Sequence, residues 1–238
     1  RSWYSPTLNR NMEIVEYGHF GPVILLLPTA AADYLEYERF LMIDVIAKYI
    51  DSGKVKVYSI NSINSESWLN NKLDGRTKVL RHNAFNQYVY NEVVPFIKGR
   101  TSLDTPIYTC GSSFGALHAA NLFFKNPWAI RGCISMSGLY DLGYYTKSYW
   151  DHDCYWNSPM HFLKDLQDEN HLNAIRSSQH IHIMTGSGDY EDPSGSRYLS
   201  GLLHHRHVPH HLDVWGYDIK HDWPTWRAML PYILETKF

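Results

Sequence analysis

The residues with the clearest capacity for chemistry are Gly111–Gly115, which read Gly-Ser-Ser-Phe-Gly. They follow a short apolar run, Pro106–Cys110, and precede a helix-like stretch, Ala116–Phe124. A G-x-S-x-G pattern at a strand-to-helix junction can hold a serine in a sharp turn with its hydroxyl exposed above a sheet. The spacing favours Ser113 over Ser112 as the nucleophile. An ordinary Gly-Ser turn fits the five residues equally well, so the rest of the chain must decide.

A serine hydroxyl is a weak nucleophile that needs a positioned base, and the base needs an orienting acid. In sheets of this kind the three groups follow one another in the order Ser, Asp or Glu, His. Asp189 comes just after the apolar run Ile181–Thr185, through Gly186–Gly188. His221 lies in the loop Tyr217–Trp223, before the last predicted helix. Asp189 and His221 therefore complete the predicted triad.

Other carboxylates near these two residues offer alternatives. Glu191 and Asp192 follow Asp189 closely, and they could instead be acids in the first turn of a helix, stabilised by its dipole. Asp222 is adjacent to His221, so its side chain is expected to point elsewhere. Asp189 is the favoured acid, with Glu191 and Asp192 left open.

The negative charge that develops on the substrate needs two backbone N–H donors. One is expected from Phe114, the residue after the nucleophile, and the other from the loop that follows the apolar strand Val23–Leu27. In that loop the donor could be Thr29, Ala30 or Ala31. Ala30 is the favoured residue, because small side chains allow the backbone to approach closely.

From Val23 onward, apolar strand-like runs alternate with helix-like segments, which predicts an α/β fold with a mostly parallel central sheet covered on both faces. One domain over residues 1–238 is expected. Asn61–Thr77 is predicted to be a polar loop, and Pro95 to disturb the end of a helix. The expected strands are Trp3–Leu8, Met12–Tyr17, Val23–Leu27, Val55–Ile60, Pro106–Cys110, Gly132–Gly138, His180–Thr185 and His211–Trp215, and the expected helices are Leu35–Ile50, Ala84–Ile97, Ala116–Phe124, His161–Leu166, Ser194–His205 and Pro224–Leu234.

Residues 139–178 interrupt this alternation with an aromatic-rich insertion before the acid-bearing strand. Such an insertion predicts a lid or a pocket wall, although a plain surface excursion is the alternative. Four aromatic residues are therefore candidates for binding substrate: Tyr34, Trp68, Trp150 and Trp156.

Composition excludes several classes of protein. The net charge of −2 gives no basic surface for nucleic acid. No run reaches the roughly 18 apolar residues of a membrane helix. The three cysteines are widely spaced, as expected for buried thiols in a cytoplasmic protein. The histidine-rich segment 204–211 has no carboxylate or cysteine at ligand spacing, so no metal and no cofactor are expected.

With these residues in view, the chain resembles the esterase branch of the α/β-hydrolase superfamily, which includes esterase D-like, feruloyl-esterase-like and mycolyltransferase-like proteins. The resemblance extends from the Val23 strand to the last helix. It is carried by Gly111–Gly115, Ser135–Gly138, Gly186–Asp189 and His221–Trp223 with Trp226.

This resemblance implies an α/β-hydrolase fold and metal-independent ester hydrolysis by a Ser113–His221–Asp189 triad through an acyl-enzyme. The chain departs from the branch at Pro28–Ala30, where a His-Gly pair is frequent. The expected partner is a small-molecule or carbohydrate-linked ester, and a homo-oligomer is left open. An acyltransferase with the same triad and a non-catalytic binding protein on a hydrolase scaffold are the alternative functions.

Overall fold

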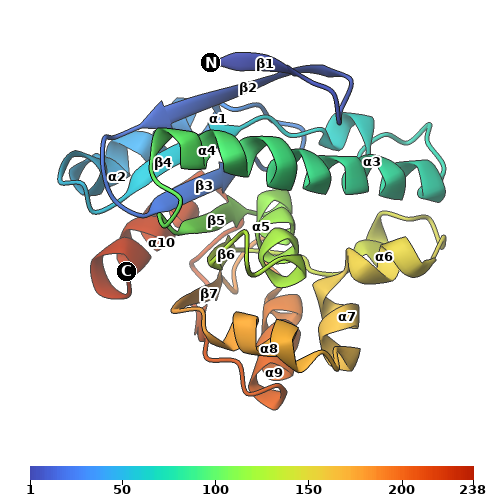
Figure 1. Ribbon diagram of the computed structural model, residues 1–238. Coiled ribbons are helices and arrows are strands. Elements are labelled where there is room, and N and C mark those ends of the chain that lie inside the picture. The colour runs from blue at the N-terminus through green and yellow to red at the C-terminus, as the bar shows by residue number, and fades with distance from the viewer.

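A computed structural model describes all 238 residues as an eight-stranded sheet with helices on both faces (Figure 1). The strand order is β1-β2-β4-β3-β5-β6-β7-β8. The pairs β1–β2 and β2–β4 are antiparallel, and the pairs from β4 through β8 are all parallel, so the predicted α/β class is confirmed. The strands are β1 (Ser2–Ser5), β2 (Arg10–Tyr17), β3 (Val23–Leu27), β4 (Lys56–Ile60), β5 (Ile107–Ser112), β6 (Gly132–Met136), β7 (His180–Thr185) and β8 (His211–Val214).

The helices form a layer on each side of this sheet. One face carries three of them: α1 (Glu36–Arg39), α2 (Met42–Asp51) and α10 (Trp223–Thr236). The opposite face is covered by α3 (Gly75–Tyr88), α4 (Val94–Arg100), α5 (Phe114–Lys125), α7 (Pro159–Asp165), α8 (Glu169–Arg176) and α9 (Pro193–His205). The short helix α6 (His152–Trp156) packs near α3.

The central strand β3 shows why its sequence is a continuous apolar run. Val23, Leu25 and Leu27 belong to the core beneath α4 and α5, whereas Ile24 and Leu26 belong to the core beneath α2 and α10. Successive side chains of a strand point to opposite faces, so a strand covered on both sides must be apolar at every position. Each such side chain contributes about 1.5–3 kcal/mol by its burial.

Two predicted helices have different bounds in the structure. The helix predicted over 35–50 is divided into α1 and α2, because Leu41 takes a left-handed conformation with φ of 61°. Helix α3 begins at Gly75, near the end of the predicted loop and well before the predicted helix start at Ala84, because Asp74 accepts the backbone N–H of Thr77 at 2.9 Å and caps it. Pro95 does not end a helix: it is the second residue of α4, which continues from α3 through a π-helical turn at Val89–Val93.

The insertion of residues 139–178 contains more regular structure than its irregular sequence indicates. It folds into a 3₁₀ turn at Leu142–Tyr144 and the helices α6, α7 and α8. Asp151 and Asp168 cap two of these helices through their side chains. Nowhere in the structure is a helix both long enough and apolar enough to cross a membrane.

Candidate active site

Ser113 occupies the tight turn between β5 and α5. Its φ of 54° and ψ of −119° form a strained backbone conformation for a residue with a side chain. A Cβ on Gly111 would lie 2.2 Å from the carbonyl carbon of Gly115, and one on Gly115 would lie 2.2 Å from the carbonyl oxygen of Leu27. The two glycines are therefore required by packing. The backbone N–H of Ser113 donates to the carbonyl of Met136 at 2.9 Å and ties the turn to β6.

His221 reaches Ser113 from the loop between β8 and α10. Its Nε2 lies 2.9 Å from the hydroxyl oxygen of Ser113. The loop is held in place by backbone bonds to the segment after β7: the N–H of His221 donates to the carbonyl of Asp189 at 3.0 Å, and the N–H of Gly188 donates to the carbonyl of Ile219 at 2.9 Å. The structure thus brings together the predicted nucleophile and the predicted base.

The acid beside His221 is Glu191 and not Asp189, which corrects the sequence prediction. Asp189 forms an ion pair with Lys220 at 2.7 Å, and its side chain is 64% exposed. Oε2 of Glu191 lies 3.6 Å from Nδ1 of His221, and this side chain is only 1% exposed. Between the two acids, Tyr190 has a φ of 63°, which turns the chain so that residue 189 faces solvent and residue 191 faces inward.

Glu191 is held by hydroxyl groups at the ends of two strands. The Ser137 hydroxyl donates to Oε1, and the Thr185 hydroxyl donates to Oε2 at 3.1 Å. Nε1 of Trp226 donates to the Ser137 oxygen at 3.0 Å. Burial raises the pKa of the Glu191 carboxyl, but His221 and Ser137 lower it more, so the pKa stays below its usual value. The carboxylate is therefore ionised at neutral pH and available to a cationic imidazole.

The predicted backbone donors come from the start of α5 and from the loop after β3. Phe114 is the first residue of α5, and the N–H of a first helical residue has no acceptor within its helix. In the loop after β3, the N–H of Thr29 is already used, because it donates to Oε2 of Glu36 at 2.8 Å. The N–H groups of Ala30 and Ala31 have no acceptor in the protein. Of the three residues predicted to supply the second oxyanion donor, only Ala30 and Ala31 therefore have a free backbone N–H.

A cavity of about 240 Å³ opens beside Ser113 and His221. The rings of Phe114 and Tyr145 lie 4.7 Å apart in its wall. Leu139 and Tyr145 come from the insertion, so this segment supplies part of the wall. The other lining residues are Leu117, Ser137, Gly138, Tyr190, Glu191 and Asp192.

Comparison with known proteins decides the family. The Esterase family model, described as "Putative esterase", matches residues 64–236, which is most of the chain. The chain belongs to this esterase family. No curated protein sequence matches it.

Solved structures of esterases share the fold of this chain. A ferulic acid esterase superposes with a TM-score of 0.77 at 17% identity, covering 98% of this chain and 95% of that one. The S-formylglutathione hydrolase FrmB from Staphylococcus aureus gives 0.68 at 15% identity, covering 99% and 93%. A fluorophosphonate-binding serine hydrolase from the same species, FphF, gives 0.67 at 14% identity, covering 99% and 95%. The α/β-hydrolase fold is thereby confirmed.

The four aromatic residues predicted to bind substrate, Tyr34, Trp68, Trp150 and Trp156, lie outside the cavity of this esterase. Trp68 is 1% exposed and donates from Nε1 to His82 at 3.1 Å, so it is a core residue behind the cavity wall. The rings of Trp150 and Trp156 pack on other side chains of the insertion. The prediction for Trp68 is wrong, and the aromatic lining comes from other positions.

Several residues that line the cavity of the esterase were not predicted to do so from the sequence, and they share one feature: each follows a strand of the parallel part of the sheet. Ser137, Gly138 and Leu139 directly follow β6, and Tyr190 follows β7. In a parallel sheet, ligands bind beyond the carboxyl ends of the strands. If that rule is applied to every parallel strand, and not only to the strands next to the triad residues, it predicts these lining residues. It does not indicate which of several neighbouring carboxylates turns inward.

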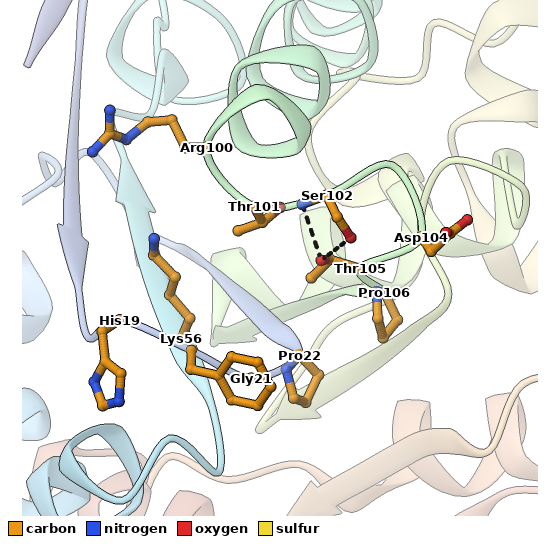
Figure 2. Close-up of a pocket in the computed structure, with 11 residues that line it drawn as sticks. His19, Gly21, Pro22, Lys56, Arg100, Thr101, Ser102, Asp104, Thr105 and Pro106 are labelled. Atoms are coloured by element: carbon orange, nitrogen blue, oxygen red, sulfur yellow. Dashed lines mark hydrogen bonds between the residues drawn. The ribbon is translucent and has the colours of Figure 1, made fainter.

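A second and larger cavity, of about 510 Å³, lies at the other end of the esterase sheet (Figure 2). Pro22 and Pro106 precede β3 and β5, and Lys56 begins β4, so this hollow is at the amino ends of the strands. Ser102 and Thr105 bond to each other there at 2.9 Å, and no histidine activates either hydroxyl. No contact in this cavity resembles the one between Ser113 and His221.

Proposed function

We propose that this esterase hydrolyses carboxylic esters with Ser113 as nucleophile, His221 as base and Glu191 as the orienting acid. The observation that carries the proposal is the 2.9 Å contact between the Ser113 hydroxyl and Nε2 of His221, made in a strained turn. A nucleophile within hydrogen-bond reach of a base, itself beside a third group, is the arrangement that nucleophilic catalysis requires.

In the first half of the reaction, the Ser113 oxygen attacks the acyl carbon while its proton passes to Nε2 of His221. The backbone N–H groups of Phe114 and Ala30 stabilise the negative oxygen of the tetrahedral intermediate. His221 then gives the proton to the departing alcohol. Water repeats these steps on the acyl-enzyme and releases the acid. The ionised Glu191 stabilises the imidazolium formed in both halves.

A fluorophosphonate probe tests this proposal directly. We expect one equivalent of probe on the peptide that contains Ser113, with parallel loss of p-nitrophenyl acetate hydrolysis, because only an activated serine displaces fluoride. Mass spectrometry of a protease digest locates the adduct. Heat-denatured protein is the control and should stay unlabelled. An adduct on another serine, or full activity after labelling, would contradict the assignment of Ser113.

The size of the cavity supports a short acyl group or a single aromatic ring as the part of the ester that binds. A cavity of about 150 Å³ holds benzene, and this one measures about 240 Å³. We expect kcat/KM for p-nitrophenyl esters to be highest between acetyl and butyryl. It should fall roughly 5- to 150-fold at decanoyl, because an oversized group displaces packed side chains at a cost of about 1–3 kcal/mol.

Two variants give this prediction a matched control. Tyr145→Ala widens the cavity wall and should move the optimum toward longer chains. Trp150→Ala removes an aromatic ring of the same insertion outside the cavity and should leave the optimum where it was. A rate that rises steadily up to decanoyl in the wild-type protein, measured with dispersed esters, would rule out the small acyl site.

A further inference from the structure

Two buried side chains hold the peptides on either side of the Ala30 N–H. Oε2 of Glu36 accepts the backbone N–H of Thr29 at 2.8 Å, and Oε1 accepts the hydroxyl of the same residue. Nδ2 of Asn64 donates to the carbonyl of Ala30 at 2.6 Å. Both Glu36 and Asn64 are buried. The Ala30 N–H is thus an unpaired donor between two anchored neighbours.

The orientation of the Asn64 amide follows from its bond to the Ala30 carbonyl and is matched by a histidine of α5. Because the Ala30 carbonyl can only accept, Nδ2 must face it, and Oδ1 then faces Nε2 of His118 at 2.8 Å. Burial lowers the pKa of His118 to about 3, so the ring is neutral at ordinary pH. Its Nε2 therefore carries the proton that Oδ1 accepts. A flip of the amide would place Oδ1 against the Ala30 carbonyl oxygen and lose that hydrogen bond.

The loop that carries Ala30 is packed directly on the helix that carries the nucleophile. A Cβ on Gly115 would lie 2.2 Å from the Leu27 carbonyl oxygen and 2.8 Å from that of Pro28. The Tyr37 hydroxyl donates to the same Leu27 carbonyl at 3.0 Å. The start of the loop is therefore fixed against α5 by packing. Its outer part, at Thr29 and Ala30, is fixed by the two side chains.

We propose that Asn64 and Glu36 are positioning residues that hold the Ala30 N–H as a donor to the substrate oxyanion. This inference rests on the function proposed above. Neither side chain lines the cavity at Ser113, so each acts through the backbone it holds. Donors that are fixed before charge develops need no reorganisation during the reaction, and loss of one such donor costs about 10²–10³ in kcat. A donor that is loosened and not removed should cost less.

Asn64→Ala is the main test, with Asn86→Ala as its control. Asn86 is an equally buried asparagine whose Nδ2 donates to Asn157 at 2.8 Å, away from the loop. We expect Asn64→Ala to lower kcat by roughly 10- to 100-fold with KM changed by less than about twofold. Affinity for an arylboronic acid, whose serine adduct is a tetrahedral anion, should fall by a similar factor. Asn86→Ala should have a lower melting temperature but the same kcat and the same affinity for the arylboronic acid as the wild-type protein.

A second variant covers the case in which Asn64→Ala does not fold. Glu36→Gln keeps the size of the side chain but removes one of the two carboxylate acceptors that Thr29 uses. It should lower kcat and boronate affinity together by roughly 3- to 30-fold, less than the loss of a complete oxyanion donor.

The possible outcomes distinguish a failure of this positioning role from a failure of the proposed esterase function. Wild-type protein that neither hydrolyses esters nor reacts with a fluorophosphonate overturns the proposed function. Wild-type protein that does both, beside an Asn64→Ala or Glu36→Gln variant with unchanged kcat and boronate affinity, overturns only the positioning role. Equal losses of kcat in Asn64→Ala and Asn86→Ala also overturn it, since they would reflect general destabilisation.

Discussion

Ser113→Ala is expected to lower kcat for ester hydrolysis by about 10⁶, the loss seen when the serine of a comparable triad is removed. The variant retains the backbone donors but has no oxygen to attack the acyl carbon. The substitution removes only the 2.9 Å hydrogen bond between the Ser113 hydroxyl and Nε2 of His221, so the fold should be unchanged. Initial rates with p-nitrophenyl acetate, corrected for spontaneous hydrolysis, measure the effect.

Ser112→Ala is the matched control for this experiment. Ser112 is the adjacent serine, at the end of β5, and its hydroxyl is buried without a hydrogen-bond partner. Its removal should change kcat by no more than about threefold, because a buried hydroxyl without a hydrogen-bond partner affects the reaction only through packing. A Ser113→Ala variant that keeps more than one hundredth of wild-type turnover, with contamination excluded by purification from a second expression host, would refute the assigned nucleophile.

Glu191→Ala should lower kcat by about 10⁴, because loss of the orienting acid leaves the imidazole in the wrong tautomer and without a partner for its charge. Asp189→Ala should leave kcat within about twofold of the wild-type value. The two acids are two positions apart, but only Glu191 is buried beside His221. Asp189 faces solvent and pairs with Lys220. The comparison is therefore a sharp test of which acid serves the base.

Stability must be measured alongside these rates. Glu191→Ala also leaves the hydroxyls of Ser137 and Thr185 without their acceptor, so its melting temperature is expected to fall. Glu191→Gln keeps an oxygen acceptor and the side-chain volume, and it should lose turnover with a smaller change in melting temperature. The reverse pattern, with Asp189→Ala inactive and both Glu191 variants active, would restore the acid predicted from the sequence.

The regular elements were predicted well where a strand is apolar throughout. Val23–Leu27 has the predicted bounds, because burial on both faces leaves a continuous apolar run with polar or small residues at its ends. The start of α3 was missed. Its first residues are polar, and the helix there depends on the Asp74 cap and on burial of Lys78 and His82 within the tertiary structure.

For the candidate active site, the sequence alone indicated the proposed nucleophile and the proposed base, Ser113 and His221. A serine at a glycine-flanked elbow and a histidine in the loop before the last helix are placed by local pattern and chain order. The carboxylate that lies beside His221, and is proposed as the acid, was decided only by tertiary structure. Tyr190 adopts a positive φ that no sequence pattern predicts. The hydroxyls of Ser137 and Thr185 then donate hydrogen bonds to the Glu191 carboxylate. Such contacts between the ends of separate strands exist only once the sheet has formed.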